Sequence, residues 1–311
     1  MTHSKKPFII LKEFPEKDDY DAVNALQTIC CGHDKTSLKL ELDYKMSAGS
    51  HTALPMKQIN EFMYHNGQEI TGYIGIGSFG GSTPEVNGMV HPDHRHKGIF
   101  RQLFGLVLDE ARKREVKALL LLCDRKSDPG QAFIKTTGAS YAHTEYEMVL
   151  TGASDALTSG QSSKTLTLRK ATNEDAYEIA RQNAVYFASG DVQAHLIMPE
   201  EEEKRGMTIW IAEDGNQIIG KVHVQLHSGL GGIYGLGVMP EFRSRGFGRL
   251  ILKMAVQQLQ EMNADAIMLQ VEARNANALN LYQSCGFEET STMDYYLLKI
   301  QPLKSGFPER G

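Results

Sequence analysis

Hydrophobic and polar residues recur along the C-terminal half of the chain in blocks that predict strands and helices in turn. Residues 247–262 carry apolar side chains at the three- and four-residue spacing of an amphipathic helix. A second helix is expected to begin at Thr172, where the first turn is acidic, and a short third helix is expected at 276–284. The expected strands are 166–168, 209–212, 218–226, 233–238, 266–272, 290–293 and 295–300, and the last two are expected to pair. This order predicts an α/β fold with a mixed sheet and helices on both faces.

The chain also contains an internal repeat with a constant offset. Segments 90–104 and 238–252 resemble each other, and their glycines, Gly98 and Gly246, differ by 246 − 98 = 148 positions. The same offset relates further pairs: Gly67 with Gly215, Gly72 with Gly220, Pro92 with Pro240, Arg95 with Arg243, and Gly138 with Gly286. One offset held without a gap indicates a tandem duplication. We therefore expect two domains, at 1–150 and 164–300, joined by the small polar residues 151–163 as a linker.

Composition narrows the class of protein. With 311 residues, of which 41% are hydrophobic and 23% charged, the chain is long enough for about two soluble globular domains. Its net charge of −5 argues against a general nucleic-acid binder, which usually presents a basic face. No apolar run approaches the ~20 residues of a membrane span, and the N-terminus lacks a secretory signal. The four cysteines lack metal-ligand spacing, so we expect a cytoplasmic protein with reduced thiols.

The strongest candidate for chemistry is the segment 243–248, R-S-R-G-F-G, between a predicted strand and a predicted helix. Glycines let the backbone turn tightly there, and the N–H groups and dipole of the helix N-terminus form a cradle suited to a pyrophosphate. The segment lacks the Gly-Lys-Ser/Thr of a Walker loop, and Ile251 replaces the third small residue of a dinucleotide-binding fingerprint. Two interpretations remain, a loop that binds acyl-CoA or a plain glycine-rich turn.

A second motif follows about 30 residues later, and together the two carry a resemblance to a known family. Residues 275–287 fit the pattern N-x-x-A-x-x-L-Y-x-x-x-G-F, and 243–248 fit R-x-x-G-x-G, in the same order. In both motifs the chain resembles the GNAT superfamily of N-acetyltransferases. The resemblance covers nearly the whole chain, most specifically its C-terminal half. It implies two tandem GNAT domains, each a mixed, mostly antiparallel sheet flanked by helices.

The resemblance implies a role for each matching residue. The loop would bind the CoA pyrophosphate, Asn275 would contact the pantetheine arm, and Tyr282 would protonate the departing thiolate. The end of the preceding strand would present its backbone to the ligand. The expected cofactor-binding residues are Leu236, Gly237, Val238, Arg243, Ser244, Arg245, Gly246, Phe247, Gly248, Arg249 and Asn275. The alternative for Tyr282 is a core aromatic residue at helical spacing with Leu279.

The general base is less well defined. Gly232 and Gln270 stand where the family commonly carries a glutamate. Glu272 lies two residues beyond Gln270 on the same strand face, so it is the expected base, with a solvated strand-end carboxylate as the alternative. His223 or Tyr234 could also act through water molecules. Some proton acceptor is required, because an amine is usually protonated at pH 7.

The N-terminal copy is expected to be degenerate and non-catalytic, with CoA binding left open. It keeps Arg95 and Gly98, but Phe100 replaces the second glycine, Ser127 replaces Asn275, and Ile134 replaces Tyr282. The cluster of His91, Asp93, His94 and His96 lies among Arg95, Lys97 and Arg101. This positive surrounding disfavours a cation, so no metal site is expected.

These patterns predict transfer of an acetyl group from acetyl-CoA to an amine acceptor, a small molecule rather than a protein. The expected enzyme acts as a monomer or homodimer, without nucleic acid, membrane or metal. The alternative function is a CoA-binding sensor or scaffold without turnover. No residue in the sequence specifies the acceptor, because one fold serves many acceptors.

Overall fold

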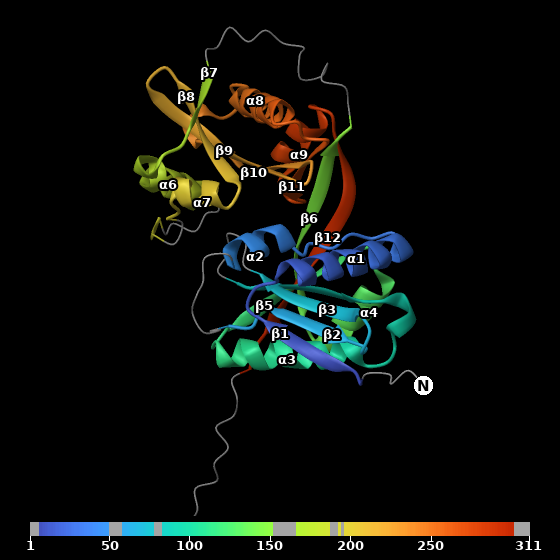
Figure 1. Cartoon of the computed structure of the whole chain (residues 1–311). Helices are drawn as coiled ribbons and strands as arrows, with labels where there is room; N and C mark the ends of the chain where they lie inside the picture. The colour runs from blue at the N-terminus through green and yellow to red at the C-terminus, as the bar shows by residue number, and fades with distance from the viewer. Residues whose placement is uncertain are drawn as a thin grey trace, which may run out of the picture. The chain divides into compact units, whose positions relative to one another are not determined.

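The computed structural model describes residues 6–49, 58–77, 83–151, 166–186, 192–193 and 196–301, and its contacts divide the chain into two compact units (Figure 1). The N-terminal unit contains Met1–Thr144 and Thr292–Gly311, and the C-terminal unit contains Glu145–Ser291. The described strands form one continuous sheet, and the part of it in each unit has helices on both faces, as the sequence predicts.

In the N-terminal unit the sheet separates two layers of helices. Its strands are β1 (Phe8–Lys12), β2 (Glu61–His65), β3 (Ile70–Gly77), β4 (Glu85–Val90) and β5 (Ala118–Asp124), in that spatial order. Neighbouring strands are antiparallel except β4 and β5, which are parallel. Because side chains alternate along a strand, Phe62 packs with α3 (Ile99–Lys113) and α4 (Asp128–Thr137), whereas Met63 packs with α1 (Lys17–Asp34) and α2 (Leu42–Gly49).

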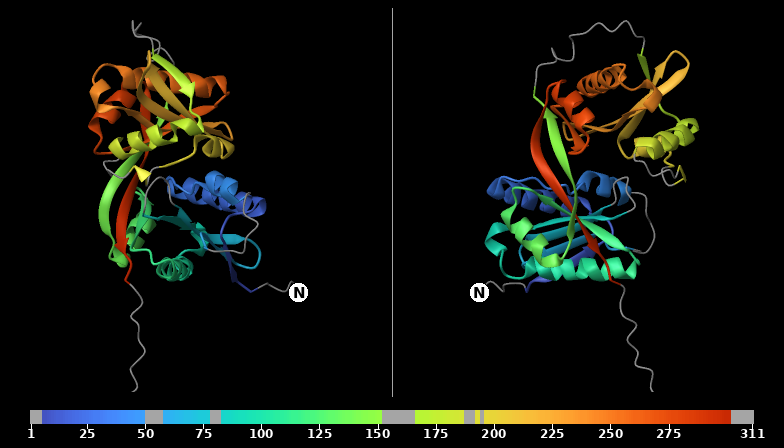
Figure 2. Two further views of the ribbon diagram at one scale, coloured as in Figure 1. Left: turned by 90° about the vertical axis from the view of Figure 1, so that its left-hand side faces the viewer. Right: turned by 180° about the vertical axis from the view of Figure 1, so that it is seen from behind.

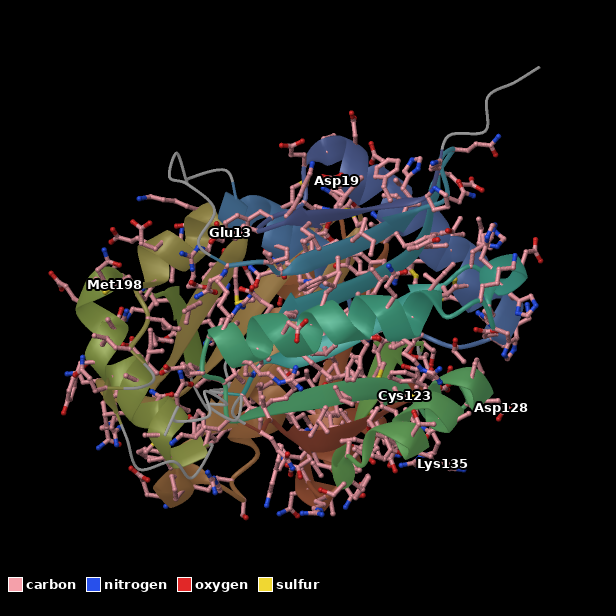
Figure 3. All side chains as sticks on the ribbon, turned by 90° about the horizontal axis from the view of Figure 1, so that it is seen from below. Glu13, Asp19, Cys123, Asp128, Lys135 and Met198 are labelled. Carbon is pink, nitrogen blue, oxygen red and sulfur yellow. The ribbon has the colours of Figure 1, made fainter. Side chains whose placement is uncertain are left out.

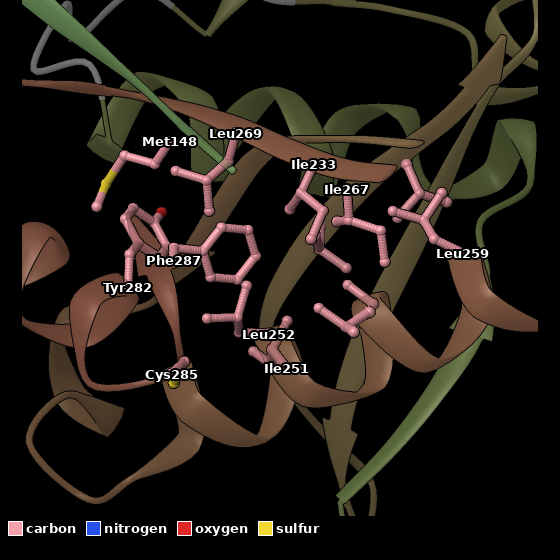
Figure 4. Close-up of a cluster of buried hydrophobic side chains, with 14 of the residues drawn as sticks. Met148, Ile233, Ile251, Leu252, Leu259, Ile267, Leu269, Tyr282, Cys285 and Phe287 are labelled. Carbon is pink, nitrogen blue, oxygen red and sulfur yellow. The ribbon is translucent and has the colours of Figure 1, made fainter. Parts of the chain in front are cut away.

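The C-terminal unit repeats this arrangement. Its strands are β7 (Leu166–Lys170), β8 (Met207–Asp214), β9 (Gln217–His227), β10 (Leu230–Val238) and β11 (Ala266–Glu272), with β10 and β11 parallel. The apolar stripe of α8 (Phe247–Glu261) packs on the sheet and buries a core (Figure 4). This core includes Tyr282 of α9 (Ala276–Gln283) and Phe287, which begins the strand after α9. Ile179 of α6 (Ala176–Tyr186) packs on the other face against Ile209 and Ile211 of β8, beside α7 (Pro199–Lys204).

Two long strands complete the sheets in an exchanged manner. The C-terminal part of β6 (Ser140–Leu150) pairs with β11, from Glu145 opposite Glu272 to Val149 opposite Met268. The C-terminal part of β12 (Phe287–Lys299) pairs with β5, from Met293 opposite Asp124 to Lys299 opposite Ala118. The two strands run side by side in both views of Figure 2 and are neighbours in the sheet. Each repeat of the sequence therefore supplies its last strand to both units.

The exchange departs from the sequence analysis in two ways. The expected pairing of 290–293 with 295–300 is wrong, because 287–299 is one continuous strand whose partners lie in β5. The contact units also do not follow the continuous ranges 1–150 and 164–300, since both units contain parts of β6 and β12. Residues 152–163 of the expected linker lie outside the described residues.

The local predictions agree better with the structure. The expected helices at 247–262 and 276–284 coincide with α8 and α9 to within one residue at each end, and the strand at 266–272 coincides with β11. Thr172 forms a capping box with Asp175 just before α6. Across the described ranges, no helix is both long and apolar enough to cross a membrane.

The exchange predicts that a residue of the second repeat stabilises the N-terminal unit. Tyr295 of β12 is buried, its hydroxyl accepts a hydrogen bond from Lys39 Nζ at 2.8 Å, and its ring stacks on His143 at 4.2 Å. Tyr295→Ala should cost about 3 kcal/mol of stability, as large-to-small core changes do. Hydrogen exchange read by mass spectrometry should rise most in peptides from β4 and β5. The matched variant Met148→Ala should raise it most in β11, and a rise confined to 166–291 in Tyr295→Ala would contradict the exchange.

Candidate active site

The parallel strands β10 and β11 pair with each other at their N-terminal ends. Leu230–Ile233 lie opposite Ala266–Leu269, and in the described strands this pairing stops at Ile233. The register between β10 and β9 shifts between Tyr234 and Gly237, and Gly235 within this bulge has φ +52°. The backbone groups that β10 turns toward β11 beyond Ile233 are therefore not used by that strand pair and can bind a ligand.

The loop after β10 leads directly into α8. A short 3-10 turn, Pro240–Phe242, follows Val238, and the chain then passes through Ser244 at φ +59° to Gly246 at φ +84°. Gly246 is the N-cap of α8, and apart from its two chain neighbours no described residue has an atom within 4 Å of the place where its Cβ would be. The first-turn N–H groups of a helix have no partner within it, so this end of α8 offers donors and partial positive charge to an anion.

The three arginines of the loop region have different surroundings. The Nε of Arg243 donates to the Val238 carbonyl at 2.9 Å, which holds the side chain along the end of β10. The guanidinium of Arg245 lies 5.8 Å from the centre of the Phe242 ring. Arg249 is turned toward the end of α9, where it donates to the Ser284 carbonyl at 3.2 Å and the Ser284 hydroxyl at 2.7 Å. Arg249 thus joins α8 to α9, whereas Arg243 and Arg245 precede the open cradle in the loop.

The two expected residues of the second motif lie at the start of α9 and within it. The Asn275 side chain caps the helix by accepting a hydrogen bond from the Ala278 amide at 3.1 Å. Tyr282 is 8% exposed and packs in the core near Met148, Leu269 and Phe287 (Figure 4). Burial raises the pKa of its phenol to about 12, so the hydroxyl keeps its proton at neutral pH. Tyr282 is therefore a core residue that also carries an un-ionised hydroxyl.

Glu272, the expected base, stands at the exposed end of β11. It lies opposite another carboxylate, Glu145 of β6, and its carbonyl accepts from the Asn275 amide at 2.9 Å. The 148-residue offset relates it to Asp124, which is buried and accepts from the backbone amides of Ser37 and Lys126 at 2.8 Å each. The repeat thus places a carboxylate at this strand end in both copies, with a structural role in the N-terminal one.

Two glycines of β10 make room for protein side chains. A Cβ at Gly237 would collide with the ring of Tyr186 on α6, and one at Gly235 would lie 3.1 Å from the Nζ of Lys221. The sequence analysis missed Lys221, although a lysine between apolar residues in the predicted strand 218–226 was a signal. Lys221 and His223 are both buried on the α6 face of β9.

The N-terminal unit preserves the backbone of the anion loop. His96 has φ +61° and Gly98 has φ +80°, which match Ser244 and Gly246. Its arginine, however, is neutralised, because Arg95 forms two hydrogen bonds to Asp34, at 2.8 and 2.7 Å. This contact also holds the pKa of the Asp34 carboxyl below its usual value. The N-terminal loop therefore keeps the backbone donors and loses a free countercharge.

A cavity of about 430 Å³ lies beside this N-terminal loop. It is lined by residues of α1, β4, β5, α3 and α4, among them Asp34, Val90, Gly98 and Phe133. Cys123 near the end of β5 also lines it, close in the chain to Asp128 at the start of α4 (Figure 3). Burial raises the pKa of the Cys123 thiol to about 12 and that of Cys30 to about 11, so both thiols stay protonated.

Two histidines before the N-terminal loop are in contact with each other, and one of them also accepts a backbone hydrogen bond. His91 accepts a hydrogen bond from the Asp93 amide at 3.2 Å, and its ring meets that of His94 edge to face at 5.5 Å. Within the part of the chain that the structure describes, no group of three His, Cys, Asp or Glu side chains is placed to hold a metal ion.

Comparisons with known proteins agree with this geometry. The model of the acetyltransferase (GNAT) family matches residues 38–139 and 173–287. A mycothiol acetyltransferase of Stackebrandtia nassauensis is 24% identical over 245 residues, which cover 74% of this chain and 79% of the relative. One from Clavibacter sepedonicus is 26% identical over 216 residues, covering 67% and 70%.

Solved structures share the fold. A tandem GNAT protein from the clavulanic acid biosynthesis pathway superposes with a TM-score of 0.71 at 15% identity, covering 96% of this chain and 99% of that one. A GCN5-related N-acetyltransferase from Sphaerobacter thermophilus gives 0.70 at 18% identity, covering 94% and 96%. The expected tandem α/β fold and the expected class of enzyme, an N-acetyltransferase, are confirmed. Because the two matched segments together span more than half of the chain, it belongs to the acetyltransferase (GNAT) family.

Proposed function

We propose that the C-terminal unit transfers an acetyl group from acetyl-CoA to the amine of a small molecule. The observation that carries this proposal is the position of the open cradle at Gly246, a short loop beyond the end of β10, where β10 still pairs with β9 but no longer with β11. A phosphate-bearing ligand in the cradle can therefore extend its other end along β10. Acetyl-CoA supplies the activated acyl group, as a thioester.

The cradle and the strand would bind different parts of this ligand. The N–H groups at the start of α8, with Arg243 and Arg245, would hold the pyrophosphate. Leu236, Gly237 and Val238 would pair through their backbone with the amide groups of the pantetheine arm. A backbone N–H of β10 would then face the thioester oxygen and stabilise the negative charge that develops there.

Tyr282 would act as the general acid. The acceptor nitrogen forms a bond to the carbonyl carbon while the carbon–sulfur bond breaks. The Tyr282 hydroxyl gives its proton to the leaving sulfur and recovers one from the attacking nitrogen. A phenol that stays protonated at neutral pH is suited to this exchange, because the hydroxyl must hold a proton when the sulfur departs.

The comparisons favour a small acceptor. Several relatives bear the name mycothiol acetyltransferase, and their matches cover at least two thirds of both chains. We take from them the class of acceptor, a small molecule with an amine, and not the individual compound.

The N-terminal unit is a candidate for CoA binding without turnover. The cavity of about 430 Å³ beside the Gly98 loop is its supporting observation. Ile134 stands at the position of Tyr282 and offers no proton, and the Arg95–Asp34 pair reduces the charge available to a phosphate. We therefore propose that this unit binds CoA more weakly than the C-terminal unit and does not catalyse transfer.

The two loops can be compared by matched substitutions. Gly246→Val should abolish acetyl-CoA binding at the C-terminal site, since both its side chain and its positive φ conflict with the cradle, and should lower kcat/KM by roughly 100-fold or more. Gly98→Val should remove a weaker second binding event and leave most turnover. Calorimetry and thiol release measure the two effects. Loss of turnover in a folded Gly98→Val protein would contradict the division of roles.

Removal of the Tyr282 hydroxyl tests the acid. Tyr282→Phe keeps the ring in the core, so folding and acetyl-CoA binding should persist while kcat falls roughly 100- to 1000-fold. Because the folded pKa of about 12 lies above that of an exposed phenol, the hydroxyl stays protonated as pH rises to about 10. The wild-type kcat should therefore show no fall due to this group below that pH. Unchanged kcat in Tyr282→Phe, when chemistry limits the rate, would reduce Tyr282 to a packing residue.

A further inference from the structure

Lys221 of β9 is a fully buried lysine with an uncommon set of partners. Its side chain is 0% exposed, and its Nζ lies 2.9 Å from His223 Nε2 and 3.1 Å from the Gly235 carbonyl oxygen. The Nζ also lies 5.6 Å from the centre of the Tyr186 ring on α6. Lys221 thus bridges the imidazole of His223, on the same strand, and the bulge of β10.

The surroundings of this pair disfavour a positive charge. Tyr186 faces it from α6 and donates its hydroxyl to Gln182, Tyr234 flanks it on β10, and the apolar Ile209 and Ile211 lie opposite on β8. Burial alone lowers the pKa of Lys221 to about 7, and burial together with the charge of Lys221 holds the pKa of His223 well below 6.5. Near neutral pH the pair is therefore ready to take up one proton.

The hydrogen-bond distances are compatible with an uncharged pair. When His223 carries its proton on Nε2, a neutral Nζ can donate a hydrogen bond to the Gly235 carbonyl and accept one from Nε2–H of His223. His223 Nδ1 is then the lone-pair nitrogen of the imidazole. At 8% exposure His223 is the more accessible member, whereas Lys221 lies behind it.

The pair occupies the part of the site where a proton acceptor is missing. Gly232, where the family commonly has a glutamate, lies on the same face of the sheet, and a Cβ there would collide with the Tyr234 ring. Tyr234 is directly opposite His223 in the β9–β10 register. The bulge at Gly235 then separates this point from the stretch of β10 assigned to the pantetheine arm.

We propose that His223 and Lys221 together accept the proton that the acceptor ammonium loses before it attacks the thioester. Nδ1 of His223 takes the proton from the ammonium nitrogen, and Nε2–H passes its proton to the neutral Nζ of Lys221. The freed amine forms the bond to carbon as described above. The lysine ammonium then returns its proton to Nε2 of His223, and Nδ1 releases its proton to water, which restores the starting arrangement. His223 is the catalytic residue, and Lys221 is a positioning residue that receives the relayed proton. This step rests on the proposed acetyl transfer.

The first test separates a base from a structural residue. Thiol release from acetyl-CoA is measured with ethanolamine, which is largely protonated at pH 7.5, and with methoxyamine, which is largely unprotonated. His223→Gln keeps a polar partner for Lys221 but cannot titrate, so kcat/KM for ethanolamine should fall by roughly 100-fold or more. With methoxyamine the loss in kcat/KM should be less than about threefold. The loss with ethanolamine should shrink as pH rises toward the pKa of ethanolamine, because less of the amine then needs a base. His227→Gln, on the same strand, should change neither.

Lys221→Met tests the relay with an apolar side chain of similar length. It should lower kcat/KM for ethanolamine more than for methoxyamine. An equal loss with both amines at every pH, in either variant, would show that the pair is structural and overturn the proposal.

A second measurement does not depend on turnover. NMR titration of the His223 ring should show an uncharged imidazole at pH 6, where an ordinary histidine is largely protonated. In Lys221→Met the pKa of His223 should rise, because the neighbouring positive charge is gone. A wild-type His223 that titrates near pH 6.5 would overturn the proposal that the two residues act as a pair. If instead the wild type releases no thiol with any amine while His223 behaves as expected, the proposed transfer fails and the proton-accepting pair stands.

Discussion

The separation of two parallel strands is the constraint on which both units depend. In the N-terminal unit β4 and β5 pair at Glu85–Leu120 and Val86–Leu121, and in the C-terminal unit β10 and β11 pair as far as Ile233. Backbone groups left unpaired in a sheet interior are costly unless water or a ligand binds them. In both units the strand on one side of the separation continues through a tight loop into a helix N-terminus. The same local geometry therefore supplies backbone donors along the strand and an anion cradle at its end.

The duplication has preserved this backbone and changed the side chains that would act on a ligand. Ser244 and Gly246 match His96 and Gly98 in φ to within a few degrees. Arg95 is bound by Asp34, whereas no described carboxylate pairs with Arg243. A well-formed cavity accordingly coexists in the N-terminal unit with weaker chemistry. The presence of a cavity and the presence of catalytic groups are separate properties, which explains why the motif-poor copy still has space for a ligand.

The sequence predicted the features that depend on neighbouring residues. The apolar spacing of α8, the loop before it and the motif of α9 are local, and the structure contains each of them near its expected place. The partner of β12 was not predictable, because the pattern along a strand determines which of its side chains share a face and does not determine which strand lies beside it. The role of Lys221 was hidden for a similar reason. Alternation puts Lys221 and His223 on one face, but only the packing of α6 and β8 determines that this face is buried.

The two units also differ in the partners of a buried charged group. The group lies on the sheet face covered by α1 in the N-terminal unit and by α6 in the C-terminal unit. By the 148-residue offset, Lys221 corresponds to Tyr73, which donates a hydrogen bond to the fully buried Glu61. Lys45 completes that network, 3.1 Å from Glu61 and 3.2 Å from the Tyr73 hydroxyl, so a cation there faces a carboxylate. Lys221 has an imidazole and a carbonyl as its partners instead, and a lysine without a carboxylate is the one whose proton can leave and return near neutral pH. In the N-terminal copy Tyr73, at the position of Lys221, thus joins an ion pair, whereas in the C-terminal copy Lys221 and His223 form the proposed proton-accepting pair. This is the division expected if catalysis has been kept in the C-terminal unit.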